Sequence, residues 1–137
     1  MTPVPYLYFN GSCEAALSAY ARIFGGEITA LMRMKDMPDP AIPQSAAEMV
    51  MHATLTLPNG ALIMASDNFR GDSAETSNIS LTMNFDTVEA AKAAFDALAD
   101  GAEIQQDFGP QFWTDGFGAL KDRFHIRWQI SAPQKAF

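Results

Sequence analysis

The sequence contains little cysteine and little positive charge, and it has no long apolar run. Cys13 is the only cysteine among 137 residues, which excludes an internal disulfide framework. Nine Lys and Arg against 16 Asp and Glu give a net charge of −7, so the chain lacks the electrostatic attraction for a phosphate backbone. The longest clean apolar run, residues 61–65, is far too short to cross a bilayer. We therefore expect neither nucleic acid nor membrane among the partners.

The composition indicates one ordinary globular domain. Apolar residues make up 48% and charged residues 18% of the chain, close to the average for globular proteins. No Lys or Arg precedes Arg22, so the charged start of a signal peptide is missing, and we expect a cytoplasmic protein. Such a domain would bind a small molecule, a protein partner or both.

The chain repeats itself at an offset of 75 residues. Residues 6–20 resemble residues 81–95, and after one inserted residue Glu27-Ile28 matches Glu103-Ile104. Each copy begins as a strand, continues as a helix with an apolar stripe and is followed by more strands. A period of just over half the chain predicts two βαβββ modules rather than a solenoid. The other matched pairs are Ser12/Thr87, Glu14/Glu89, Ala15/Ala90, Ala16/Ala91, Ala19/Ala94 and Tyr20/Phe95.

Breakers and caps set the expected boundaries. We predict a single domain over 1–137, with module one at about 1–67, a linker at about 68–77 and module two at about 78–137. Ser12 is the expected cap of the first helix and Gly25-Gly26 its end, while Asp86 and Glu89 have capping-box spacing for the second. The predicted strands are 4–9, 27–34, 49–57, 61–67, 79–85, 102–107, about 112–120 and 124–131.

Three predicted strands combine an apolar face with a mostly polar one. We expect the apolar faces to pack under the helices. The polar faces either meet solvent or line the concave side of a curved sheet, and periodicity does not distinguish these. The apolar and polar sets are Met49, Met51, Ala53, Leu55 and Leu57 against Val50, His52, Thr54 and Thr56; Ile79, Leu81 and Met83 against Asn78, Ser80, Thr82 and Asn84; and Phe124, Ile126, Trp128 and Ile130 against His125, Arg127, Gln129 and Ser131.

Motifs along nearly the whole chain carry a family resemblance. They are residues 5–11, Glu14-Ala-Ala, Tyr20, Phe24-Gly-Gly, Met51-His-Ala, residues 62–67, Phe112-Trp113, Phe117-Gly118, Asp122-Arg-Phe and Trp128. In this order they resemble the vicinal oxygen chelate superfamily, which includes glyoxalase I, dioxygenases and bleomycin resistance proteins, and within it the PhnB-like branch. The resemblance implies an α+β fold in which two βαβββ modules form one cupped mixed sheet with the helices on the outer face. It also implies a homodimer.

Metal-dependent members of that superfamily place four His, Glu or Gln ligands on the first and fourth strands of each module. Transferred to this sequence, the positions fall at Pro5, at or beside Met64, at Asn78 and at Gln129. Proline and methionine cannot hold a hard divalent cation, and Gln129 alone is not enough. We therefore expect no metal of the usual kind and no other cofactor. Asp67, the nearest carboxylate, is expected in the turn after its strand.

The PhnB-like branch also carries a methyltransferase label, which the sequence does not support. No Gly-rich loop follows a strand in the way that would hold S-adenosylmethionine. Another departure from the family is the final turn, where Asp-x-Phe-Gly becomes Asp122-Arg-Phe-His125. If the family glycine has a positive φ, His125 inherits that strain, and a local register change is the alternative.

Six side chains are candidate ligand contacts, and each has a structural alternative. His52 is a hydrogen-bonded structural histidine, or a general base or ligand contact. Arg127 anchors an anion or pairs with a surface carboxylate. The aromatic pair Phe112 and Trp113 lines a pocket rim, packs in the core or contacts a second copy. The full set is His52, Ser80, Phe112, Trp113, Arg127 and Gln129.

Three functions remain open at this level. The first is a protein that binds a small neutral or singly anionic organic molecule in the cupped sheet without the usual metal centre. The second is an enzyme, lyase- or dioxygenase-like, that uses His52 or a non-standard metal site. The third is a dimeric interaction domain without a ligand.

Cys13 lies at a helix start, which favours a thiolate, but no Lys or Arg is near it in sequence.

Overall fold

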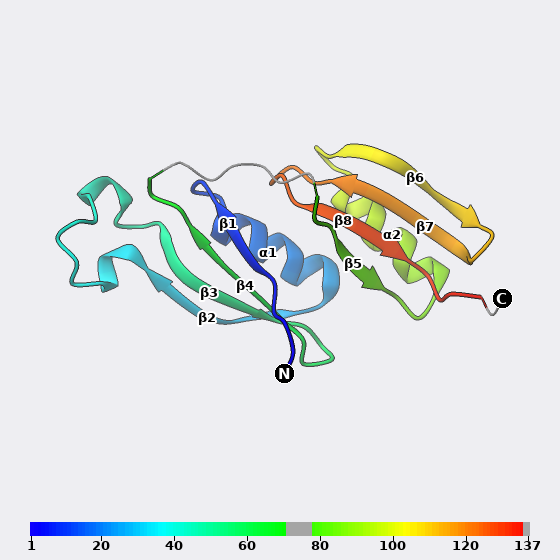
Figure 1. Ribbon diagram of the computed structural model, residues 1–137, viewed down its shortest axis with the longest axis horizontal. Helices are drawn as coiled ribbons and strands as arrows, with labels where there is room; N and C mark the ends of the chain where they lie inside the picture. The colour runs from blue at the N-terminus through cyan, green and yellow to red at the C-terminus, as the bar shows by residue number, and fades with distance from the viewer. Residues whose placement is uncertain (71–77, 136–137) are drawn as a thin grey trace. The chain divides into compact units, whose positions relative to one another are not determined.

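The computed structural model describes residues 1–70 and 78–135 (Figure 1). The chain divides into two compact units, so residues 1–70 belong to the first unit and residues 78–135 to the second. The predicted linker at about 68–77 lies, from residue 71 onward, outside the described residues. In the first unit the elements are β1 (Tyr6–Phe9), α1 (Cys13–Phe24), β2 (Glu27–Arg33), η1 (Met34–Asp36), η2 (Gln44–Ala46), β3 (Val50–Thr56) and β4 (Leu62–Asp67). In the second they are β5 (Leu81–Asn84), α2 (Val88–Leu98), β6 (Glu103–Gln111), β7 (Thr114–Lys121) and β8 (Arg127–Ser131).

Each unit is one βαβββ module, which confirms the α+β prediction. The strands form two four-stranded mixed sheets, ordered β1-β4-β3-β2 and β5-β8-β7-β6. In both sheets the first strand pairs in parallel with the last, and the remaining pairs are antiparallel. The repeat is confirmed element by element, because β1 and β5 begin at Tyr6 and Leu81, and β2 and β6 begin at Glu27 and Glu103.

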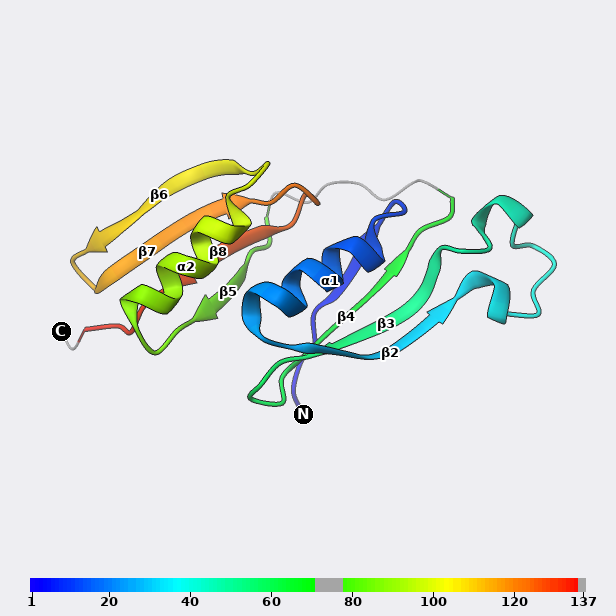
Figure 2. The same cartoon turned by 180° about the vertical axis from the view of Figure 1, so that it is seen from behind.

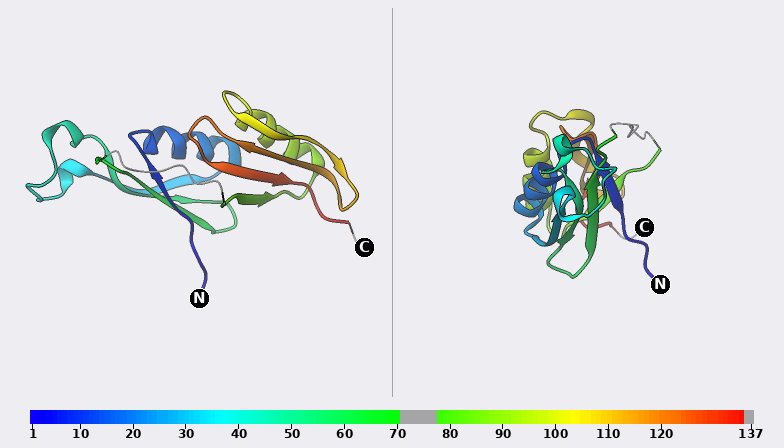
Figure 3. Two further views of the ribbon diagram at one scale, coloured as in Figure 1. Left: turned by 45° about the horizontal axis from the view of Figure 1, so that its top comes forward. Right: turned by 90° about the vertical axis from the view of Figure 1, so that its left-hand side faces the viewer.

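One helix covers one face of each sheet (Figure 2, Figure 3). The apolar stripe of α1 buries Leu17 and Tyr20 completely, and Leu55 of β3 is fully buried in the same unit. Under α2, Phe95 packs over Gly118 of β7, where the missing side chain makes room for the ring. Trp128 of β8 is fully buried in the same unit. The helix-free face of each sheet is therefore the one left for polar or ligand-binding side chains.

Asp67 and Thr87, rather than the predicted residues, cap the two helices. The Ser12 side chain makes no capping bond, and Asp67 Oδ1 instead accepts the N–H groups of Gly11 (2.9 Å) and Cys13 (3.0 Å). In α2, Thr87 Oγ1 accepts the Ala90 N–H at 3.1 Å, one residue beyond the predicted cap at Asp86. Asp67 is buried as the last residue of β4, so placing it in the following turn was wrong.

A β-bulge changes the predicted faces of β3. Met32 pairs with His52 and Arg33 with Val50, so Met51 is an extra residue between them. Val50 is consequently buried at 1% exposure, although alternation predicted it on the polar face with His52. The prediction that Ile79 packs under a helix was also wrong, because it precedes β5 and is 61% exposed.

The last strand begins three residues later than predicted because a turn occupies its start. Asp122 Oδ1 accepts the N–H groups of Phe124 (2.9 Å) and Ile126 (3.0 Å). His125 adopts a φ of 72°, so the expectation that it takes the conformation of a glycine is confirmed. Over the described residues, no helix is long and apolar enough to cross a membrane.

Candidate functional site

The helix-free face of the first sheet presents two tyrosines beside a histidine. Strand register puts Tyr6 of β1 next to Met64 of β4, which pairs in turn with Thr54 of β3. One step along, Tyr8 lies next to Ser66. We call this surface the tyrosine face; its residues are Tyr6, Tyr8, His52, Thr54, Met64 and Ser66.

A hydrogen-bonded chain links three of these side chains. The Tyr6 hydroxyl lies 3.0 Å from His52 Nδ1, and His52 Nε2 lies 3.2 Å from Thr54 Oγ1. The Tyr6 ring also packs against the rings of Tyr8 and His52, with centroids 5.1 and 5.6 Å away. Both His52 nitrogens thus have partners, which confirms a hydrogen-bonded histidine. This hydrogen-bonded series of side chains reaches the surface at Tyr6, which is 37% exposed.

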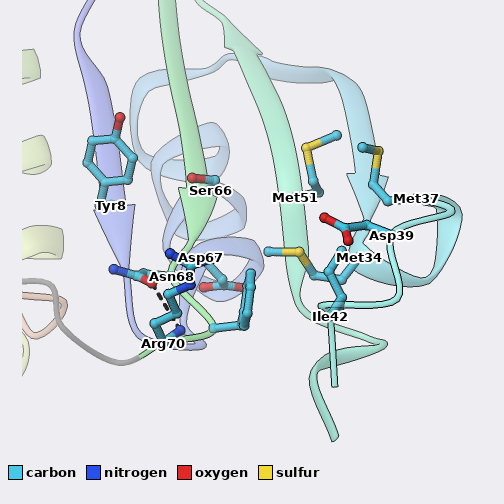
Figure 4. A pocket seen from close by; sticks show the side chains of 11 residues that line it. Tyr8, Met34, Met37, Asp39, Ile42, Met51, Ser66, Asp67, Asn68 and Arg70 are labelled. Atoms are coloured by element: carbon cyan, nitrogen blue, oxygen red, sulfur yellow. Dashed lines mark hydrogen bonds between the residues drawn. The ribbon is translucent and has the colours of Figure 1, made fainter. Parts of the chain in front are cut away.

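A hollow of about 430 Å³ adjoins the tyrosine face and shares Tyr8 and Ser66 with it (Figure 4). β4 and the segment after it supply polar groups, whereas the β3 bulge and the η1 loop supply thioethers. Because the bulge moves Met51 off the helix side, this side chain lines the hollow. The lining consists of Tyr8, Met34, Met37, Asp39, Ile42, Met51, Ser66, Asp67, Asn68, Phe69 and Arg70.

The hollow is largely apolar, with one acidic and one basic side chain available. The Asp67 carboxylate is committed to the protein, because it also accepts the Val50 N–H at 2.9 Å through Oδ2. Asp39 and Arg70 are exposed, and the Arg70 guanidinium lies 5.4 Å from the centroid of the Phe69 ring. Sulfur and aromatic surfaces with few polar groups suit a flat organic molecule.

Five of the six predicted site residues lie in the second unit. Gln129 of β8 pairs with Thr82 of β5, whose hydroxyl donates to Gln129 Oε1 at 3.2 Å. Arg127, two residues earlier, shares that side of β8 and is half-buried. Ser80 precedes β5 and is exposed, so the residue beside Gln129 is Thr82 rather than Ser80.

The structure brings Phe112 and Trp113 together near the β6–β7 turn. Their rings meet edge-on with centroids 5.0 Å apart, and Trp113 also meets Phe117 at 5.6 Å. Phe112 is 80% exposed, so its ring is not core packing. A rim position or a contact with a second copy remain the two predictions for this residue.

Tyr6 and Tyr8 were missed from the sequence. The signal for the tyrosines was present, because Tyr6 and Tyr8 alternate with Leu7 and Phe9 in a period of two. The position of Met51 in the hollow carried no such signal. Strand alternation places Met51 on the same face as Ala53, and only the bulge turns it away from that face.

The fold's usual metal positions do not fit a divalent cation. The register places Tyr6 opposite Met64 and Thr82 opposite Gln129, so these side chains stand beside the predicted positions at Met64 and Gln129. A phenol, a thioether, a hydroxyl and an amide are poor ligands for a hard cation. Among residues 1–70 and 78–135, no three His, Cys, Asp or Glu side chains gather in a way that could hold a metal.

Comparison with known proteins assigns the family. The model of the family described as 3-demethylubiquinone-9 3-methyltransferase matches residues 2–131. The chain belongs to this family. It is 32% identical to Protein YjdN of Escherichia coli, over 93% of this chain and 92% of that protein.

Solved structures of family members share the fold. Protein PA1353 of Pseudomonas aeruginosa has 34% identity and a TM-score of 0.88, covering 98% of this chain and 99% of its own. The PhnB protein of Bacillus cereus has 28% identity and a TM-score of 0.82, covering 97% and 100%. A glyoxylase/bleomycin resistance protein/dioxygenase domain from Frankia, 16% identical with a TM-score of 0.68 over 100% and 94%, is alike in fold alone.

The family's methyltransferase description implies S-adenosylmethionine, for which the described residues offer no fitting cradle. A nucleotide-type cofactor needs free N–H groups where a strand turns into a helix. Between β1 and α1 the N–H groups of Gly11 and Cys13 already bind Asp67. At the start of α2 the Ala90 N–H binds Thr87. No step of a reaction is therefore assigned to this cofactor.

Cys13 does not act as a nucleophile in the folded protein. Its side chain is fully buried, and burial, with Asp67 and Glu14 adding negative charge, raises the pKa of its thiol to about 12. The thiol is therefore neutral at physiological pH, contrary to what its position at a helix start favoured.

Proposed function

We propose that this protein is a metal-free member of the vicinal oxygen chelate superfamily that binds a small planar organic molecule, neutral or singly anionic, on the tyrosine face. The observation that carries the proposal is the hollow of about 430 Å³, which shares Tyr8 with the aromatic cluster of Tyr6 and His52. That volume lies in the range of small-molecule sites. One side of the ligand would meet rings, and the other would meet thioethers.

The charges near the hollow set the ligand class. Arg70 is the basic side chain in the lining. Of the two acidic side chains, Asp67 binds three backbone N–H groups, so Asp39 is the one available to a ligand. A ligand with one carboxylate or sulfonate would approach Arg70, while a dianion would meet Asp39 unfavourably. The chemistry therefore favours a flat ring system with at most one negative charge.

The second unit carries proposed ligand contacts of its own. Arg127 and Gln129 share one side of β8, and the Thr82–Gln129 pair offers a hydroxyl and an amide at neighbouring positions. The exposed ring of Phe112 and its neighbour Trp113 supply apolar area. With Ser80, these are the polar and aromatic groups that a ligand of the second unit would use.

The enzyme alternative is weaker at His52. Both ring nitrogens already have partners, Tyr6 and Thr54, so abstracting a proton directly would break one of those bonds.

A dimer, in contrast, is favoured by exposed apolar side chains, and we propose that two copies of the chain associate in the cytoplasm. Those side chains are Leu31 and Met32 on edge strand β2, Ile104 on edge strand β6, and Phe112.

Methyl NMR tests the binding proposal. The chain has eight methionines, and the ε-methyl groups of Met34, Met37 and Met51 report on the hollow. Titration with naphthalene-2-carboxylate and naphthalene-2-carboxamide should shift these three signals saturably and leave the exposed Met1 unchanged. Tyr8→Ala should weaken the response, and Asp115→Asn, at an exposed position in the second unit, should leave it unchanged. Absence of any saturable shift at the three methyls, with both probes, would show that the hollow is not the site.

A further inference from the structure

We infer that the Tyr6 hydroxyl is the polar ligand contact of the tyrosine face, and that the tautomer of His52 sets whether this hydroxyl donates or accepts a hydrogen bond. The inference rests on the proposed function and adds a residue and a ligand preference to it. Tyr6 would be the contact, and His52 a positioning residue that never touches the ligand.

The argument begins with the number of protons in the chain Tyr6–His52–Thr54. A neutral imidazole has one N–H donor and one bare nitrogen acceptor. Nδ1 faces the Tyr6 hydroxyl at 3.0 Å and Nε2 faces the Thr54 hydroxyl at 3.2 Å. A hydroxyl can donate or accept, so the histidine's single proton fixes the direction of both bonds at once.

Two arrangements satisfy the same three side chains. With the proton on Nε2, His52 donates to Thr54 and Tyr6 donates to Nδ1, which leaves the Tyr6 oxygen as an acceptor for a ligand. With the proton on Nδ1, Thr54 donates to Nε2 and His52 donates to the Tyr6 oxygen, which frees the Tyr6 O–H as a donor. Each arrangement keeps both internal hydrogen bonds, so a ligand need supply little energy to select one.

Packing explains why Tyr6 suits this role. Its ring is held between those of Tyr8 and His52, at 5.1 and 5.6 Å, so the hydroxyl keeps one position. The ring is still 37% exposed, whereas Ser66, on the same face, is only 8% exposed. Tyr6 is therefore both fixed and accessible. The site should accept flat ligands that present either a donor or an acceptor at one edge.

Two bicyclic probes of similar size separate the two states. Indole carries an N–H donor and no acceptor of comparable strength, while quinoline carries a nitrogen acceptor and no donor. Each probe is titrated into the full-length, ¹⁵N-labelled protein while long-range ¹H–¹⁵N spectra of the histidine rings are recorded. Only two histidines occur, so His52→Gln assigns the spectrum and His125 serves as the internal control.

Indole should move the proton of His52 to Nε2, and quinoline should move it to Nδ1, with His125 unchanged by both. Tyr6→Phe should weaken both probes about 3- to 10-fold, the effect of one ordinary hydrogen bond. Thr29→Val, which removes a hydroxyl of the same unit that pairs with the Thr56 hydroxyl at 2.9 Å, should leave both affinities within about twofold. A purely structural His52 would give the same tautomer with either probe.

The outcomes distinguish this inference from the proposed function. If both probes shift the methyls of Met34, Met37 and Met51 but His52 keeps one tautomer, the relay is overturned and the binding face stands. If Tyr6→Phe and Thr29→Val weaken the binding of the probes equally, Tyr6 is not the specific contact. If neither probe gives a saturable shift, both the relay and the proposed site are overturned.

Discussion

Oδ1 of Asp67 accepts the backbone N–H of Cys13 at 3.0 Å, although 54 residues separate the two. The same carboxylate binds the N–H groups of Gly11 and Val50, so it joins the end of β4 to the start of α1 and to the start of β3. Charge-assisted bonds of this kind are stronger than neutral ones. One buried side chain thereby fixes how helix and sheet meet beside the hollow.

Asp67→Asn should destabilise the first unit by about 2–4 kcal/mol. The carboxylate accepts three backbone N–H groups through two oxygens, whereas the amide of asparagine has only one oxygen. Urea denaturation monitored by circular dichroism measures the change. Asp115→Asn is the matched control, since Asp115 is exposed and pairs only with Lys135 at 2.8 Å among the ion pairs of the described residues. Equal losses in both variants would contradict the central role of Asp67.

Cys13 should resist thiol reagents and make stability fall at alkaline pH. Burial raises the pKa of its thiol from the ordinary value of 9.0 to about 12, so the folded state retains this proton more strongly than the unfolded state. The resulting contribution is fully present below pH 9 and is lost as the pH rises from there toward 12.

Two measurements check this behaviour. At pH 8, 5,5′-dithiobis(2-nitrobenzoate) should react with Cys13 only after denaturant is added. Between pH 8 and pH 10, the free energy of unfolding should drop by about 1.4 kcal/mol more in the wild type than in Cys13→Ala. Parallel pH profiles for the two proteins would contradict the raised pKa.

Gly118→Ala should destabilise the second unit by about 1–3 kcal/mol through overpacking. A Cβ at Gly118 would lie 2.6 Å from Cε2 of Phe95 and 3.1 Å from the backbone Cα of Phe108. Gly109→Ala on the neighbouring strand is the control, because nothing lies within 4 Å of its added Cβ. Thermal unfolding of the two variants compares them directly, and we expect only Gly118→Ala to lower the midpoint clearly.

The backbone of His125 should prefer glycine to alanine. His125 has a φ of 72°, a conformation that costs a residue with a Cβ about 1–2 kcal/mol. His125→Gly and His125→Ala both remove the imidazole, so their difference isolates the backbone. His125→Gly should be the more stable by about 1 kcal/mol in urea denaturation. Equal stability would indicate that the turn rearranges.

Two copies of the chain should associate. Multi-angle light scattering at micromolar concentration should give twice the chain mass of 14.9 kDa. Replacing Leu31 and Met32 by Lys would place charges on an exposed apolar edge, and we expect the mass to fall toward that of one chain if β2 forms the contact. A single-chain mass for the wild type would remove the dimer proposal.

The sequence predicted the architecture well because the repeat is visible at several levels. Strand, cap position and aromatic recur in both copies, so one copy supports the interpretation of the other. Alternation failed where the ladder is irregular, at Val50 and Met51, because a bulge is decided by pairing with β2 rather than by residue type.

The site was predicted in part. His52 was identified, but its partner Tyr6 was not, because the two residues are 46 apart in sequence and only the pairing of β1 with β4 and of β4 with β3 brings them together. The cap provided by Asp67 could not be found locally, since the helix and the carboxylate that caps it are far apart in sequence.

The parallel pairing of β1 with β4 has a consequence for the order of folding during synthesis. β1 and α1 are synthesised before β4, and β1 has no partner strand in its sheet until residues 62–67 have been made. Until then the nascent chain exposes both edges of β1, and the N–H groups of Gly11 and Cys13 wait for Asp67. The same delay recurs in the second unit, where β5 waits for residues 127–131. Each sheet is therefore complete only after its final strand, β4 or β8, has been synthesised. Truncation of that strand should prevent the whole module from folding.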